Sequence, residues 1–185
     1  MVNSLSLHGH DGQRKYLNQQ ERLRFLAVAK LQPTEISLFC QLLYYTGARI
    51  GEIHNLSTQS IDHPNGTVVI ESLKKRKHGV FREIPIPNDL LNDLKVYYED
   101  NNQDRLWSFS LRTASRKVKR IMIAANIKGI RSSAKGLRHG FAVYAVTKVP
   151  LVMVKKWLGH SKLETTEIYL NVVGAEERAL ASRIW

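Results

Sequence analysis

The sequence predicts a mixed α+β domain that is mainly α-helical and contains a small three-stranded antiparallel sheet. Over most of the chain, apolar residues recur at the helical spacing i, i+3, i+4, i+7. Between residues 67 and 86 this pattern gives way to two short β-prone runs that flank a cationic turn. The 185 residues include 43% hydrophobic and 24% charged side chains, which is the composition of a globular domain with one core.

The first fifteen residues are polar and predict a mobile N-terminal arm, so the folded domain is expected to cover residues 16–185. A helix is expected from Tyr16 to near Lys30. The side chains expected on its buried face are Leu23, Leu26 and Ala27.

A second helix is expected to begin after Pro33, because the first helical position needs no backbone N–H. Its apolar side chains at helical spacing are Ile36, Phe39, Cys40 and Leu43. Gly47 is expected to end this helix, and a short helix over residues 51–56 follows.

The β-prone runs at residues 67–70 and 81–86 predict a hairpin whose turn holds the basic run 74–79. Pro85 and Pro87 place the second strand at an edge of the sheet or at its own end. Residues 106–109 are the candidate third strand.

Helices are expected over most of the remaining chain. The first is capped by Asn88 or Asp89. The next has a buried face of Val118, Ile121, Met122 and Ala125. Further helices are expected at about 135–148, 150–158 and 162–169, with a last one at 175–185.

The charge balance indicates a polyanionic partner. Lysine plus arginine number 28 against 16 aspartate plus glutamate, a formal net charge of +12. DNA and RNA are the first partners to consider, because phosphate neutralisation gives affinity for any sequence. The basic residues expected to contact DNA are Lys74, Lys75, Arg76, Arg116, Lys117, Lys119 and Arg120.

Several classes of protein are disfavoured. The single cysteine, Cys40, excludes an internal disulfide and a cysteine-rich zinc module. No apolar run approaches the about eighteen residues of a membrane span, and no secretory signal is visible, so a cytoplasmic location is expected. Phosphate-loop, GxGxxG and HExxH motifs are absent, so no cofactor and no metal are expected. The pair His8 and His10 is interpreted as solvated tail.

Taken singly, the polar residues that stand out have ordinary structural explanations. Arg49 follows a helix end and can interact with its dipole, and Tyr169 can be an amphipathic side chain. Together they form an ordered set within the stretches Thr46–Glu52, Lys135–Ala142, Val149–His160 and Thr165–Tyr169. This order resembles the catalytic half of the tyrosine recombinase (phage-integrase-type) family, from about Tyr16 to the C-terminus.

The resemblance implies a role for each matching residue. Arg49 and Arg138 would grip the scissile phosphate, with His160 as a further donor, because the transition state gathers charge on the non-bridging oxygens. Lys77 would be the general acid, with Lys75 and Lys74 as fallbacks. Tyr169 would be the nucleophile that forms a 3′-phosphotyrosine.

Two further residues would support this set, namely Glu52, which would orient neighbouring groups, and His139. Where the family usually has histidine, the sequence has Lys135, which can donate to phosphate but is a poorer proton acceptor near neutral pH. Typical members also carry an N-terminal DNA-clamping domain. The chain therefore resembles either the short stand-alone recombinases or an excised catalytic domain over residues 16–185.

The resemblance implies double-stranded DNA as partner, a homo-oligomer on DNA such as a synaptic tetramer, and a monomer or weak oligomer without it. The last segment, 175–185, either docks on a neighbouring protomer or packs on its own domain. The alternative function is a DNA-binding regulatory or accessory protein on the same fold. A type IB topoisomerase-like nicking enzyme and a basic RNA-binding domain are further alternatives. A cytoplasmic recombinase would be nucleoid-associated in a bacterium, or would act in the host cell if phage-borne.

Overall fold

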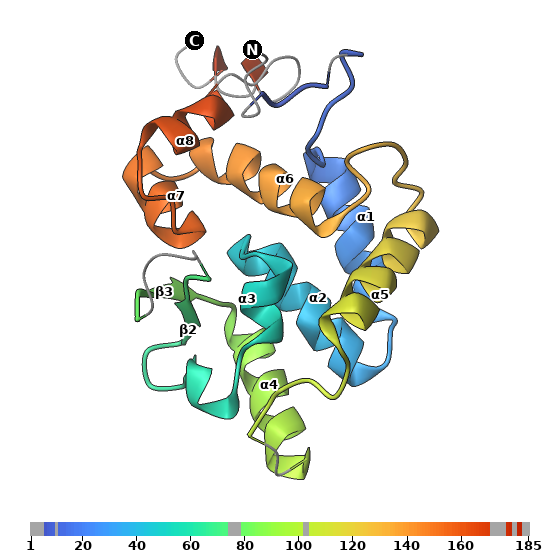
Figure 1. The fold of residues 1–185 in the computed structure, drawn as a ribbon, viewed down its shortest axis with the longest axis vertical. Helices are drawn as coiled ribbons and strands as arrows, with labels where there is room; N and C mark the ends of the chain where they lie inside the picture. Colours follow the sequence, from blue (N-terminus) through green and yellow to red (C-terminus); the bar gives the residue numbers. More distant parts are fainter. Residues whose placement is uncertain are drawn as a thin grey trace.

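Helix α2 (Thr34–Thr46) runs through the centre of the protein, and other helices surround it (Figure 1). The computed structural model describes residues 6–9, 11–73, 79–101, 104–170, 177–178 and 181–182. The remaining helices in these ranges are α1 (Gln19–Lys30), α3 (Ile50–His54), α4 (Asn88–Asn101), α5 (Leu111–Ala124), α6 (Ala134–Val146), α7 (Leu151–Leu158) and α8 (Glu164–Glu167). Short 3-10 turns lie at Thr58–Ser60 and Ile168–Leu170. None of the helices described has the length and apolar character needed to cross a membrane.

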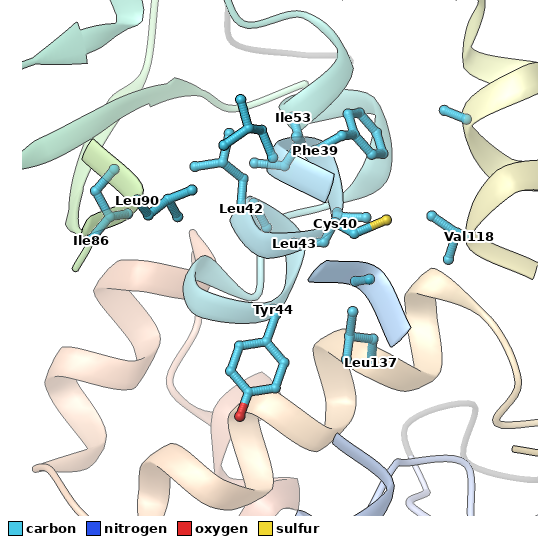
Figure 2. Packing of buried hydrophobic residues seen from close by; sticks show 14 of the residues in the cluster. Phe39, Cys40, Leu42, Leu43, Tyr44, Ile53, Ile86, Leu90, Val118 and Leu137 are labelled. Atoms are coloured by element: carbon cyan, nitrogen blue, oxygen red, sulfur yellow. The ribbon is translucent and has the colours of Figure 1, made fainter. Parts of the chain in front are cut away.

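The main core forms around α2, whose side chains from Ser37 to Tyr44 are all buried. Figure 2 shows the packed residues Phe39, Cys40, Leu42, Leu43, Tyr44, Ile53, Ile86, Leu90, Val118 and Leu137. They come from α2, α3, α4, α5 and α6 and from the segment after the sheet, so burial at α2 holds distant parts of the chain together. Burial also raises the pKa of the Cys40 thiol to about 12.

The sheet has the antiparallel order β1 (Ile61–Asp62), β2 (Thr67–Glu71) and β3 (Phe81–Pro85). The predicted hairpin is confirmed, with Val68 opposite Ile84. The candidate third strand at residues 106–109 is wrong, since the third strand is β1. That segment instead anchors aromatic rings: Trp107 and Phe109 pack edge-on against Phe39, and the Trp107 indole N–H donates to the Ile53 carbonyl at 2.7 Å.

The buried face of α1 also differs from the prediction, since Leu23 is 50% exposed. The helix buries Phe25 and Ala29 together with the charged Glu21 and Arg22. Glu21 pairs with the partly exposed Arg14 and Arg131. The Arg22 guanidinium lies 4.5 Å from the ring of Tyr44 and donates to the Tyr44 carbonyl. Periodicity that counts only apolar residues therefore indicated the wrong face of this helix.

The described part of residues 1–15 is packed, where the sequence predicts a mobile arm. Residues 6–9 and 11–15 fold back on themselves, with a bridge between His8 and Arg14 and a hydrogen bond from Lys15 N to the Leu7 carbonyl at 2.8 Å. Leu7 is buried in a second apolar cluster with Tyr16, Phe141, Ala142, Val143, Ala145, Val154, Leu158 and Tyr169. One apolar side chain in a polar stretch is enough to seat this segment against α6 and α7.

Candidate active site

Arg49 is placed by the sharp junction between α2 and α3. Gly47 ends α2 in the left-handed region, at φ +61, and Arg49 is the N-cap residue of α3. Its backbone N–H donates to Glu52 Oε2 at 2.8 Å, and its guanidinium Nη1 donates to Glu52 Oε1 at 2.9 Å. The Arg49 side chain keeps 39% exposure, so it is oriented and still open to an incoming anion.

Glu52 is fully buried and is held by a second arginine. Arg82 of β3 donates from Nη2 to Glu52 Oε2 at 2.6 Å and from Nε to the Trp157 carbonyl at 2.7 Å. Burial alone would raise the pKa of the Glu52 carboxyl, but Arg82 and then Arg49 outweigh it and lower that pKa below its ordinary value. Glu52 is therefore a fixed anion, and its pairing with Arg82 joins α3 to β3 and, through Arg82, to the end of α7.

Sequence reasoning missed Arg82. A signal was present, because Arg82 and Ile84 are two residues apart on β3 and so share its buried face. A cation on the apolar face of a strand indicates a buried carboxylate partner.

Arg138 of α6 reaches across to two other segments. Its Nη1 donates to the Gly47 carbonyl at 2.8 Å, and its Nη2 donates to the Leu158 carbonyl at 2.7 Å. The residue is buried, and burial together with the nearby charge of Arg49 lowers the pKa of its guanidinium to about 10. It therefore remains a cation at neutral pH.

His160 follows Gly159, which ends α7 in the left-handed region at φ +64. Its Nε2 lies 3.2 Å from Arg138 Nη2, and its Nδ1 lies 2.9 Å from the Thr166 hydroxyl. A guanidinium can only donate, so Nε2 is the acceptor and Nδ1 carries the proton that is donated to Thr166.

Tyr169 lies in the 3-10 turn after α8 and is only 2% exposed. Its hydroxyl is 2.8 Å from Nδ1 of His139, and its ring lies nearly parallel to the His160 ring, at 6.3 Å and 13°. Burial raises the pKa of the Tyr169 hydroxyl against the lowering effect of Arg138 and Arg49. Burial lowers the pKa of His139 to about 4, helped by the charges of Lys135, Arg138 and Lys15.

These side chains line one cavity of about 380 Å³. Its wall is formed by Ser6, Lys15, Arg49, Ile50, Ala134, Lys135, Arg138, His139, His160, Thr165, Ile168 and Tyr169. Four lysine and arginine residues and a tyrosine thus line one concave site, which suits an anion that is attacked by a nucleophile. A larger hollow of about 840 Å³ between α2 and α4 carries Asp89 and Asp93 and none of the motif residues.

The structure therefore brings together Arg49, Lys135, Arg138, His160 and Tyr169. His139 shares their cavity, and Glu52 lies behind it, against Arg49. Lys15 is a cation of this cavity that the sequence did not single out, because it falls in the expected arm. Lys77, with Lys74, Lys75 and Arg76, lies outside the described residues, as does most of the predicted helix 175–185.

The predicted basic residues of α5 do not line the cavity. Lys119 donates to the Ser132 carbonyl at 3.0 Å, and Lys117 lies 5.8 Å from the Phe109 ring. Arg116 and Arg120 are exposed. Within the described ranges, no cluster of three or more histidine, cysteine, aspartate or glutamate side chains could hold a metal ion.

Comparison with known proteins identifies the family that this chain resembles. The model of the phage integrase family matches residues 15–176. Tyrosine recombinase XerA from Pyrococcus furiosus is 29% identical over 91% of this chain and 61% of its own length. A tyrosine recombinase from Thermosipho africanus is 33% identical over 86% of this chain and 54% of its own length. The chain thus spans about three-fifths or less of these relatives.

Solved structures support the fold. The crystal structure of XerA recombinase superimposes with a TM-score of 0.78 and 23% identity, over 91% of this chain and 64% of that one. The structure of XerH site-specific recombinase bound to difH substrate superimposes with a TM-score of 0.74 and 21% identity, over 96% of this chain and 59% of that one. The catalytic domain of bacteriophage HP1 integrase superimposes with a TM-score of 0.67 and 20% identity, over 90% of this chain and 93% of that one. The predicted fold class, mainly helical with a three-stranded antiparallel sheet, is confirmed.

Proposed function

The chain belongs to the phage integrase family, and we propose that it is the catalytic part of a site-specific DNA recombinase that cuts and rejoins strands through Tyr169. One observation carries this proposal. Tyr169 lines the same cavity as Arg49, Arg138 and His160, although four separate segments of the chain supply these residues. A nucleophile beside a cluster of phosphate-binding cations is the arrangement that phosphoryl transfer to a protein side chain requires.

In the proposed reaction a DNA phosphodiester occupies the cavity. Arg49 and Arg138 donate hydrogen bonds to the non-bridging oxygens, where negative charge accumulates in the pentavalent transition state. With the phosphate bound, Nε2 of His160 is proposed to carry a proton and to donate to these oxygens instead of accepting from Arg138. Glu52 orients Arg49, with which it shares two hydrogen bonds.

The bond changes balance without a cofactor. The Tyr169 oxygen forms a bond to phosphorus, and the bond from phosphorus to the 5′-oxygen breaks. Lys77 gives the departing 5′-oxygen its proton in this proposal. The 3′-phosphotyrosine keeps the phosphoester energy, so a 5′-hydroxyl of the same or another strand can attack it and rejoin the DNA.

Double-stranded DNA is the proposed partner, and the net charge of +12 supports it. Among structural neighbours, XerH and lambda integrase were solved with DNA bound. We extend the proposal to a homo-oligomer on DNA, because strand exchange between two duplexes needs an active site for each strand cut. The segment 175–185 is the proposed contact between protomers.

Covalent trapping tests the proposal. Purified protein is mixed with nicked duplexes tiled across the DNA that flanks its own gene, and adducts are separated by denaturing electrophoresis. We expect a protease-sensitive adduct that Tyr169→Phe abolishes while DNA binding persists. Tyr98→Phe is the matched control, because Tyr98 lies on α4 and not on the cavity wall. Salt-dependent binding with no adduct would overturn the recombinase and favour the DNA-binding regulatory protein.

A further inference from the structure

The hydroxyl of Tyr169 is paired with the imidazole of His139. The oxygen lies 2.8 Å from Nδ1, and the two ring centres are 5.7 Å apart. His139 is on α6, directly after Arg138, whereas Tyr169 is on the turn after α8. The hydrogen bond therefore connects the nucleophile to the helix that holds the phosphate-gripping arginine.

Lys135 does not make this contact. It lines the same cavity from the first turn of α6, but within the described residues the hydrogen bond of the Tyr169 hydroxyl goes to His139. His139 lies one helical turn beyond Lys135, so both side chains point from the same face of α6. The helix thus places a cation at the cavity wall and an imidazole beside the nucleophile.

The surroundings of His139 keep its ring neutral. The cations that face it are Lys135 and Arg138 from its own helix and Lys15 from the N-terminal segment, and these charges add to burial in lowering its pKa to about 4. A neutral imidazole has one nitrogen able to accept a hydrogen bond. The 2.8 Å contact fits a hydroxyl that donates to Nδ1, which is the direction that the inference below requires; Nε2 then carries the ring proton.

We propose that Nδ1 of His139 accepts the proton of Tyr169 when the tyrosine attacks DNA, and that Lys135 instead donates a hydrogen bond to the phosphate. The O–H bond of Tyr169 breaks as its oxygen bonds to phosphorus, and the proton moves to His139, which becomes an imidazolium. The bond to the 5′-oxygen breaks, and that oxygen is protonated by a separate acid. This inference rests on the proposed function and names the base that the reaction needs.

Substrate itself would strengthen this base. A DNA phosphate in the cavity brings negative charge next to Lys135, Arg138 and Lys15, whose charges oppose an imidazolium in the unliganded protein. The added anion stabilises the protonated ring, so the pKa of His139 rises when DNA is bound. Tyr169 would therefore be activated as a nucleophile only when DNA is bound, and it would remain unreactive in the free protein.

The test measures single-turnover formation of the covalent adduct from pH 5 to 9. His139→Ala removes both the hydrogen bond and the base. His139→Asn keeps an oxygen near the position of Nδ1, so it can hold the hydroxyl but cannot take its proton. We expect both variants to lose about 10²-fold or more in rate. Lys135→Gln should lose less and keep the pH profile of the wild type.

A second substrate separates the base from the acid. In a 5′-bridging phosphorothiolate the leaving sulfur departs without a proton, so it relieves a missing acid but not a missing base. His139→Asn should stay slow on this DNA, whereas Lys77→Ala should recover. Urea unfolding and DNA affinity, measured for each variant, show whether the protein remains folded and bound to substrate.

The outcomes separate this inference from the proposed function. If the wild type forms an adduct and His139→Asn reacts at the wild-type rate, His139 only positions the hydroxyl and the inference is wrong. It is also wrong if the phosphorothiolate restores His139→Asn. If the wild type forms no adduct with any duplex, the proposed function fails first. Nitrogen-15 NMR of labelled histidines would then still reveal whether His139 is the Nε2–H tautomer and whether Tyr169→Phe shifts its Nδ1 signal.

Discussion

Arg82 and Glu52 form a buried ion pair of 2.6 Å that ties the sheet to the helix carrying Arg49. The same guanidinium donates to the carbonyl of Trp157, two residues before Gly159. A Cβ placed on Gly159 would come within 3.1 Å of the Arg82 guanidinium, so the α7 end packs closely on this arginine. One ion pair therefore fixes the relative position of β3, Arg49 and the loop that presents His160.

Arg82→Met should destabilise the protein strongly. Its side chain is 6% exposed and that of Glu52 is 0% exposed, so the substitution leaves a buried carboxylate with Arg49 as its remaining partner. Losing one member of a buried pair costs about 3–5 kcal/mol in free energy of unfolding. Urea denaturation of Arg82→Met, Glu52→Gln and the double variant measures the coupling. A coupling below about 0.5 kcal/mol would show that the pair is not important for stability.

Acid should weaken the fold in two separate pH windows. The pKa of His139 is lowered from 6.5 to about 4 in the folded protein. Between these two values the unfolded chain binds a proton that the folded protein does not. The contribution of His139 to stability is therefore complete above pH 6.5 and declines as the pH falls toward 4. The pKa of Glu52 lies below its ordinary value of 4.5, so its contribution is lost at still lower pH. His139→Gln should flatten the dependence of unfolding free energy on pH between 4.5 and 6.5. Glu52→Gln should leave that window unchanged, and equal slopes in wild type and His139→Gln would contradict the assignment.

Most of the fold was predictable because it follows local patterns. The faces of α2 and α5 and the β2–β3 hairpin are determined by apolar spacing and turn residues that lie close together in the sequence. The packed Leu7 segment and the polar face of α1 were not predictable in this way. They depend on contacts with α6 and α2 that only the tertiary structure provides.

The candidate site likewise contains residues that local sequence motifs predict and residues that depend on distant contacts. Its motif residues were found because each lies in a recognisable stretch, such as Arg138 within residues 135–142. Arg82 and Lys15 belong to no such stretch, and their roles arise from neighbours far away in the chain. The pairing of His139 with Tyr169 likewise spans thirty positions and required the structure.

Gly47→Ala should disturb both stability and catalysis. Gly47 has φ +61, and a Cβ there would collide with the ring of Phe141. The left-handed backbone costs about 1–2 kcal/mol and the overpacking about 1–3 kcal/mol more in free energy of unfolding. Since the Gly47 carbonyl accepts from Arg138, a shifted backbone should also slow adduct formation.

Gly66→Ala is the matched control for this substitution. Gly66 has φ +64, but nothing lies within 4 Å of a Cβ built there. It should therefore show only the backbone cost and leave adduct formation unchanged. Thermal or urea unfolding of the two variants gives the comparison. An equal loss of stability in both would mean that Phe141 moves aside without cost.

Lys15→Gln should weaken DNA binding through a lost phosphate contact. Lys15 lines the cavity beside Arg138 and Lys135, where the phosphodiester is proposed to bind. Each phosphate contact contributes about 0.9 to the slope of log K against log salt, because counterions are released on binding. The variant should therefore bind less tightly with a slope smaller by about 0.9, measured by fluorescence anisotropy at several salt concentrations. Lys95→Gln removes the same charge from α4, where Lys95 faces Glu99, and should keep the wild-type slope. If both variants lowered the slope equally, overall charge rather than a contact at the cavity would explain the role of Lys15.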